Sequence, residues 1–129
     1  MDDFRGTWNC GGTTWTIAQA PGDSSWASVT YAGRKTVYGT AYVGWLPQLQ
    51  SFVYRDFHND GSLAELTSAP PTDNTWTWTG AYYAGMEPVD THGRVTWTYK
   101  APGTIVRHFG KEQDGKYVEL GHDECAKSG

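Results

Sequence analysis

The sequence predicts an all-β fold, an antiparallel up-and-down barrel of about 8–10 strands that closes between its first and last strands. The composition is the first reason: 129 residues include seven Trp, eight Tyr, four Phe and 16 Gly. Strands favour aromatic residues, and turns favour Gly. The other two reasons are turn signals at short intervals and a two-residue alternation between them.

The turn signals divide the chain into short segments. Asp-Gly between alternating runs is the strongest short hairpin signal. The signals are Pro21-Gly22-Asp23, Asn59-Asp60-Gly61, Pro70-Pro71-Thr72-Asp73-Asn74, Pro102-Gly103 and Asp114-Gly115.

Alternation is clearest in Thr75-Trp76-Thr77-Trp78-Thr79 and in Thr96-Trp97-Thr98-Tyr99. Successive side chains of a strand point to opposite faces, so the aromatic residues share one face and the threonines the other. The aromatic face is expected to point inward. Many such short strands in one chain indicate a sandwich or a barrel.

We expect one domain over residues 1–129, with no helix longer than about two turns. Residues 83–91 form an irregular stretch, expected to be either a lid at the barrel rim or an ordinary surface loop. The expected strands are 4–18, 26–33, 36–44, 50–58, 62–68, 74–82, 92–101, 104–110 and 116–124.

The charge pattern argues against nucleic acid as a partner. The net charge is −4 and the ten basic residues are scattered, whereas nucleic-acid binding needs a clustered basic patch. No apolar run approaches the roughly 18 residues of a membrane-spanning helix. The first residues lack the features of a signal peptide, so the protein is expected to be either cytoplasmic or exported with its leader removed. The sequence makes no prediction of oligomeric state.

Cys10 and Cys125 are the only cysteines. An up-and-down barrel places its first and last strands side by side, so the two are candidates for a disulfide that joins the ends of the chain. Two free thiols are the alternative. The disulfide would imply an oxidising compartment, and so a periplasmic or extracellular location.

Several short motifs resemble one family. Phe4-Arg5-Gly6-Thr7-Trp8-Asn9-Cys10 matches F-x-G-x-W-x-C, and Cys125-Ala126-Lys127 matches C-x-K; 52–56 and 76–80 resemble the middle motifs. The chain is thus similar to a bacterial family of exported, calycin-like barrels without an established function. Gly6-Thr7-Trp8 also resembles the G-x-W opening of lipocalins, which implies that Trp8 plugs one end and that Arg107 packs over it. The T-D-Y motif of lipocalins is absent. The resemblance implies a calyx and names no ligand.

Motifs of catalysis and cofactor binding are missing: the sequence has no G-x-S-x-G, H-E-x-x-H, Walker loop or G-x-G-x-x-G. A nucleophile at Ser24 has no base positioned by the sequence. The histidines His58, His92, His108 and His122 lack the short paired spacing of a metal site. One His in an apolar barrel could ligate haem, but the sequence selects none of the four for that role. We therefore expect no metal and no cofactor.

The strand 50–58 carries the most informative polar residues. Phe52, Tyr54, Asp56 and His58 share one face, opposite Val53, Arg55 and Phe57. If the first face points inward, Asp56 and His58 enter the interior; if the second does, Arg55 enters. An ionisable group on a cavity wall is a site candidate, and solvated groups at the barrel rim are the alternative.

Three functions are compatible with this pattern. The first is binding of a small, largely apolar or aromatic ligand in the barrel, with walls from the candidates Phe52, Arg55, Trp76, Trp78, Trp97, Tyr99, Arg107 and His122. The second is a cofactor-independent isomerase, cyclase or lyase in the same cavity, with Tyr54, Asp56 and His58 as catalytic residues. The third is a carbohydrate-binding domain, which requires exposed aromatic side chains.

Overall fold

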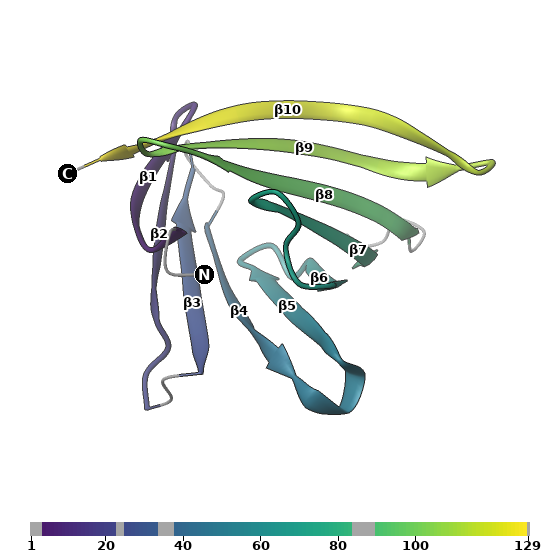
Figure 1. The fold of residues 1–129 in the computed structure, drawn as a ribbon, viewed down its shortest axis with the longest axis horizontal. Coiled ribbons are helices and arrows are strands. Elements are labelled where there is room, and N and C mark those ends of the chain that lie inside the picture. Colours follow the sequence, from purple (N-terminus) through teal and green to yellow (C-terminus); the bar gives the residue numbers. More distant parts are fainter. Residues whose placement is uncertain (1–3, 23–24, 34–37, 84–89, 129) are drawn as a thin grey trace.

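The computed structural model describes residues 4–22, 25–33, 38–83 and 90–128. In this part of the chain ten antiparallel strands form a closed barrel in which each strand pairs with its neighbours in sequence and β1 pairs with β10 (Figure 1). The predicted fold class is confirmed. The strands are β1 Gly6–Cys10, β2 Thr13–Gln19, β3 Trp26–Ala32, β4 Tyr38–Leu46, β5 Ser51–His58, β6 Leu63–Ser68, β7 Thr75–Tyr83, β8 Asp90–Lys100, β9 Thr104–Gln113 and β10 Lys116–Ser128.

The prediction of a single first strand over 4–18 is wrong. Cys10 pairs with Thr13 across a two-residue turn, and β1 and β2 are the two arms of a hairpin. Gly11 and Gly12 make this turn with φ angles of 61° and 99°, a conformation that glycine adopts without strain. The two adjacent glycines were therefore a turn signal that the prediction overlooked.

Two of the predicted turns are tight hairpin turns with left-handed backbone. Asp114 and Gly115 join β9 to β10 with φ angles of 53° and 75°, and Asp73 and Asn74 stand before β7 with 52° and 59°. Asn, Asp and Gly tolerate this conformation best. The irregular stretch 83–91, predicted as either a lid or a surface loop, lies mostly outside the described residues, as do Asp23 of the first predicted turn and Ser24.

Aromatic side chains fill the end of the barrel where odd-numbered strands begin. Trp8 is completely buried there, and its indole N–H donates to the Phe4 carbonyl oxygen at 2.7 Å. The Trp8 and Tyr99 rings meet edge to face, and the Phe52 and Trp76 rings do the same. The prediction that Trp8 plugs one end of the barrel agrees with this packing.

The seam between first and last strands is short. Only Thr7, Trp8 and Asn9 of β1 pair with β10, opposite Ser128, Lys127 and Ala126. The predicted disulfide joins Cys10 to Cys125 directly after these pairs, across a sequence separation of 115 residues. From there β10 continues beside β9 toward the far end, and β1 ends (Figure 1). The barrel is thus tied at the aromatic-filled end and wider at the other.

Candidate functional site

A cavity of about 500 Å³ occupies the wider end of the barrel. This volume lies within the usual range of small-molecule pockets, about 300–1,000 Å³. Tyr82 and Leu120 are exposed, so the cavity opens to solvent beside them. Its aromatic walls come from six strands and consist of Trp15, Tyr31, Tyr54, Trp78, Tyr82, Trp97 and Phe109.

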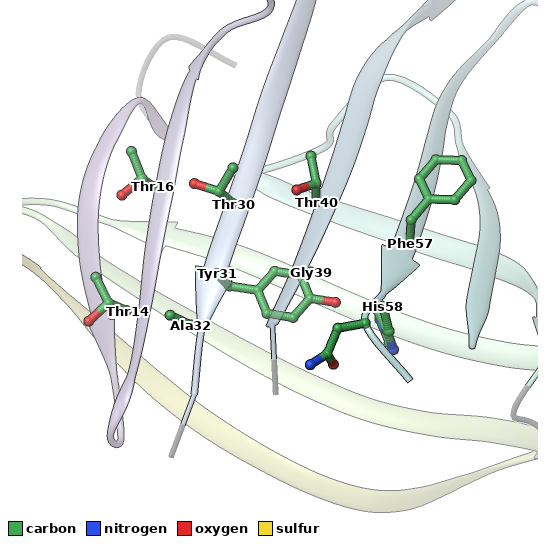
Figure 2. A pocket seen from close by; sticks show the side chains of 10 residues that line it. Thr14, Thr16, Thr30, Tyr31, Ala32, Gly39, Thr40, Phe57 and His58 are labelled. Atoms are coloured by element: carbon green, nitrogen blue, oxygen red, sulfur yellow. The ribbon is translucent and has the colours of Figure 1, made fainter. Parts of the chain in front are cut away.

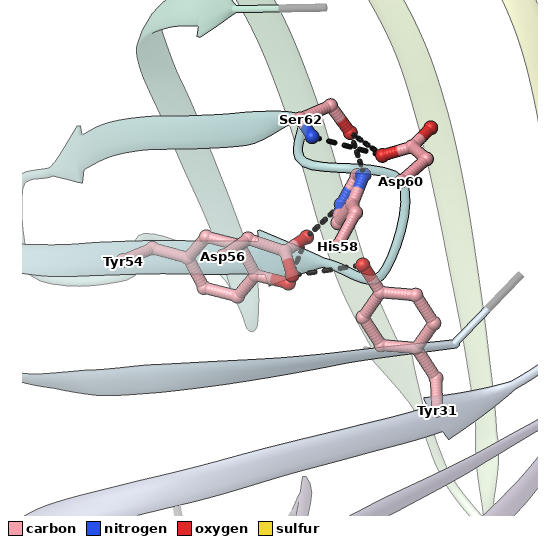
Figure 3. A network of polar contacts seen from close by, with 6 residues as sticks. All are labelled: Tyr31, Tyr54, Asp56, His58, Asp60 and Ser62. Atoms are coloured by element: carbon pink, nitrogen blue, oxygen red, sulfur yellow. Dashed lines mark hydrogen bonds and ion pairs between the residues drawn. The ribbon is translucent and has the colours of Figure 1, made fainter. Parts of the chain in front are cut away.

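Asp56 on β5 is the centre of a polar network at this cavity (Figure 3). The Tyr31 hydroxyl donates to its Oδ1 at 2.8 Å, and the Tyr54 hydroxyl donates to its Oδ2 at 3.3 Å. Nε2 of His58 lies 3.0 Å from the same Oδ2. Asp56 is 8% exposed, and a buried carboxylate is tolerated only when it is paired in this way.

The network extends from His58 to the turn after β5. Nδ1 of His58 lies 2.6 Å from the Ser62 hydroxyl oxygen, and that hydroxyl donates to Oδ1 of Asp60 at 2.7 Å. A serine hydroxyl has one proton. Because the Ser62 hydroxyl donates that proton to Asp60, its oxygen can only accept in the contact with His58. Ionised Asp56 also only accepts. With Ser62 donating to Asp60 and with Asp56 accepting, the protonated form of His58 satisfies both of its contacts.

These contacts and the burial of the network shift the pKa values of the residues around Asp56. The hydrogen bond to Asp56 raises the pKa of His58 above its usual 6.5. Burial, reinforced by the Asp56 charge, raises the pKa values of Tyr31 and Tyr54. The hydrogen bonds from Ser62 lower the pKa of Asp60. Both tyrosines are thus held as neutral donors beside one carboxylate and one imidazolium.

Arg107 supplies a second polar group to the cavity, from β9. Its Nε donates to Asp123 Oδ1 at 2.7 Å and its Nη2 to Oδ2 of the same carboxylate. The guanidinium carbon lies 3.9 Å from the Trp15 ring centroid. The expectation that Arg107 packs over Trp8 is therefore wrong: the side chain over Trp8 belongs to Lys127, with Nζ at 5.4 Å from the ring. Trp15, on the second arm of the first hairpin, takes the place expected for Trp8.

The predicted site residues fall into three groups. Tyr54, Asp56, His58, Trp78, Trp97 and Arg107 line the cavity. Phe52, Trp76 and Tyr99 pack in the aromatic-filled end. Arg55 and His122 lie apart from both.

The last two predicted residues do not line the cavity. Arg55 is on the outer face of β5, 3.5 Å from Glu65 on β6. The His122 side chain is 68% exposed, with Nδ1 3.6 Å from Glu119. The Tyr54 face of β5 therefore points inward, and the alternative that places Arg55 in the interior is wrong.

Tyr31 reaches Asp56 across an intervening strand. Tyr31 on β3 pairs with Gly39 on β4, and the next strand, β5, carries Asp56. A Cβ atom at Gly39 would lie 2.3 Å from the Tyr31 ring. Glycine is thus required for the ring to cross β4. Tyr31 is not among the predicted site residues, since only the order of the strands reveals this contact. Gly39 within a strand was the available signal.

We expect Gly39→Ala to displace the Tyr31 ring and to lower the free energy of unfolding by about 1–3 kcal/mol. Gly121→Ala is the matched control, because the atom nearest to its added Cβ is a Phe109 carbon at 3.9 Å. Urea denaturation measures both variants. Equal stability of Gly39→Ala and wild type would show that the Tyr31 ring does not require a glycine at position 39.

A surface depression adjoins the cavity at the same rim (Figure 2). Thr16, Thr30 and Thr40 stand in register across β2, β3 and β4 on the outer face, and Phe57 on β5 continues the row. Tyr31 and His58 border both hollows. The depression lacks the aromatic enclosure of the cavity, so the cavity is the better candidate site.

Metal ligation has no support in the described ranges. No group of three or more His, Cys, Asp and Glu side chains there is arranged to hold a metal ion, and Cys10 and Cys125 are bonded to each other. None of the described segments forms a helix with the length and hydropathy needed to cross a membrane.

Comparisons with known proteins do not assign a function to this site, so its function has to be inferred from the geometry. No family model matches the chain, and no curated protein matches it. The ten-stranded closed barrel is compatible with a calycin-like fold.

Proposed function

We propose that this protein binds a small, largely apolar or aromatic molecule in the cavity at the wider end of the barrel. The observation that carries the proposal is the cavity of about 500 Å³ between aromatic walls, with the Asp56 network at one side. Ligand pockets combine mainly apolar walls with a few convergent polar groups.

The walls offer rings rather than hydrogen-bond donors. Trp78 and Trp97 are buried with ring centroids 5.5 Å apart. Their indole N–H groups are enclosed and have no acceptor within the described part of the chain. Trp15 adds a third ring, edge to face with Trp97. Most of the binding free energy of a flat apolar ligand would therefore come from contacts with these rings and from the burial of its apolar surface.

The geometry favours binding over the alternative of a cofactor-independent isomerase, cyclase or lyase. A catalytic base or acid needs an atom within hydrogen-bond reach of the substrate. Both ring nitrogens of His58 are engaged, one by Asp56 and the other by Ser62. Carbohydrate binding on a surface platform has less support, because none of the seven tryptophans is exposed.

The neutral fluorescent probe N-phenyl-1-naphthylamine tests the proposal. We expect saturable one-to-one binding, with energy transfer from tryptophan to the probe. Ala64→Phe places a ring in the cavity and should weaken binding about tenfold or more, since Ala64 lines the cavity on β6. Thr67→Phe on the other face of β6 is the matched control and should bind like wild type.

The proposal fails if wild type shows no saturable binding. It also fails if Ala64→Phe, shown by circular dichroism to be folded, binds the probe as tightly as Thr67→Phe.

We also infer an oxidising location, periplasmic or extracellular, for this barrel. The Cys10–Cys125 disulfide supports it, because disulfides are rare in the cytosol.

A further inference from the structure

The aromatic walls surround a single acidic side chain. Among the described residues that line the cavity, Asp56 is the only Asp or Glu. Six rings of Trp and Tyr from the described residues line the same space, and most of them contact one another: Trp15 stacks on Tyr31, and Tyr54 meets both Trp78 and Trp97. Rings of this kind attract cations through their faces.

Each arginine that lines the cavity is paired with a carboxylate. Arg107 is paired through two nitrogens with Asp123, and its guanidinium lies between the rings of Trp15 and Phe109. Arg94 is paired with Glu112 at 2.9 Å. Each arginine of the described lining thus has its own carboxylate partner, and Asp56, paired with His58, is the carboxylate that faces the cavity.

Asp56 retains capacity for one more partner. A carboxylate has about four acceptor positions, and Tyr31, Tyr54 and His58 occupy three of them. In Figure 3 the two tyrosine hydroxyls and the imidazole converge on this carboxylate from separate positions. Each of the three partners donates, so a ligand completes the set as a donor or a cation rather than as an anion.

From this geometry we propose that the ligand is an aromatic ammonium compound, whose ring lies among Trp15, Trp78 and Trp97 and whose cationic nitrogen lies beside Asp56. The inference rests on the proposed function and adds the charge of the ligand to it. His58 is then the internal competitor of the ligand, because its imidazolium already compensates Asp56.

This competition gives binding a pH dependence. The groups that face His58 are Asp56 and Tyr31, Asp60 and Ser62 beyond β5, and Tyr82 on β7. As pH rises through the raised pKa of His58, the imidazolium loses its proton and Asp56 is no longer compensated. A permanent cation should therefore bind more tightly at higher pH, and a neutral ligand should not.

Three probes with one ring system test the proposal on the intact protein by calorimetric titration. They are trimethyl(naphthalen-2-ylmethyl)ammonium, naphthalen-2-ylmethanol and naphthalen-2-ylacetate. We expect the cation to bind about tenfold more tightly than the neutral alcohol, and the anion to bind most weakly. Because the pKa of His58 is raised, the preference for the cation should grow as pH rises above the ordinary His value of about 6.5.

Two variants locate the effect. Asp56→Asn should reduce the cation preference to within about twofold, whereas Asp114→Asn removes the same charge at the β9–β10 turn and should leave it unchanged. His58→Gln keeps a donor for Asp56 and should abolish the pH dependence of cation binding. If Asp56→Asn does not fold, the affinities of the three probes for wild type and for His58→Gln still test the proposal.

Equal affinity for the cation and the alcohol would overturn this inference and leave the proposed function in place. Tightest binding of the anion would overturn it as well and would point to Arg107 as the anchor. Absence of binding by all three probes would count against the proposed function itself.

Discussion

Removal of the disulfide with the double variant Cys10→Ser/Cys125→Ser should lower the free energy of unfolding by about 4–5 kcal/mol. The bond closes a loop with a sequence separation of 115 residues, and a cross-link of that span restricts the unfolded chain strongly. It also stands where the pairing of β1 with β10 ends. Denaturation by guanidinium under non-reducing conditions measures the loss.

Hydrogen exchange should show which strands become less stable when the disulfide is removed. Without the bond, amides of β10 near Ala126 should exchange faster than those in the β3–β4 pair, because three residue pairs alone would hold the seam. Ser128→Ala is the control: it removes only a hydrogen bond of 3.3 Å at the same seam and should change stability by less than about 0.5 kcal/mol. Two titratable thiols in the native protein would contradict this account of closure.

The second large effect is expected from Asp56→Ala. The substitution removes the acceptor of the Tyr31 and Tyr54 hydroxyls and the counter-charge of His58. Loss of one partner of a buried ion pair costs about 3–5 kcal/mol. Asp114→Ala at the exposed β9–β10 turn is the comparison, and urea denaturation gives both values. A loss below about 1 kcal/mol would show that the network is solvated rather than buried.

The same network makes stability depend on pH in a defined direction. Since the pKa of His58 is raised in the folded protein, its contribution is complete below the unfolded value of about 6.5 and is lost as pH rises through the folded value. The stability of wild type should therefore fall as pH rises above about 6.5 and through the raised pKa of His58, and His58→Gln should lose this pH dependence.

Much of the barrel was predictable because local patterns determine it. The Thr-Trp alternation of β7 and β8 predicts which side chains face inward, and Trp76, Trp78 and Trp97 are buried accordingly. The disulfide followed from the rule that an up-and-down barrel joins its first and last strands. The two strands within 4–18 were predicted as one because Gly11 and Gly12 were not recognised as the turn between them.

The site was less predictable because it depends on contacts between strands. Both faces of β5 carry aromatic and charged residues, so its own pattern did not decide between Tyr54 and Arg55 as inward residues. The partners of Asp56 come from β3 and from the turn after β5, and the Tyr31 contact further depends on a glycine in β4. Arg107 lies over Trp15 rather than Trp8 because of strand register, which the motif alone does not encode.

The most direct test of the central claim is a crystal structure of the protein soaked with 6-bromonaphthalen-2-ol, in which anomalous scattering locates the bromine. We predict one strong bromine peak inside the barrel, among Trp15, Trp78 and Trp97, with the ligand hydroxyl toward Asp56. An interior filled by side chains with no bromine peak, or a peak only in the outer depression beside Thr30 and Phe57, would contradict the claim that the barrel cavity is the binding site.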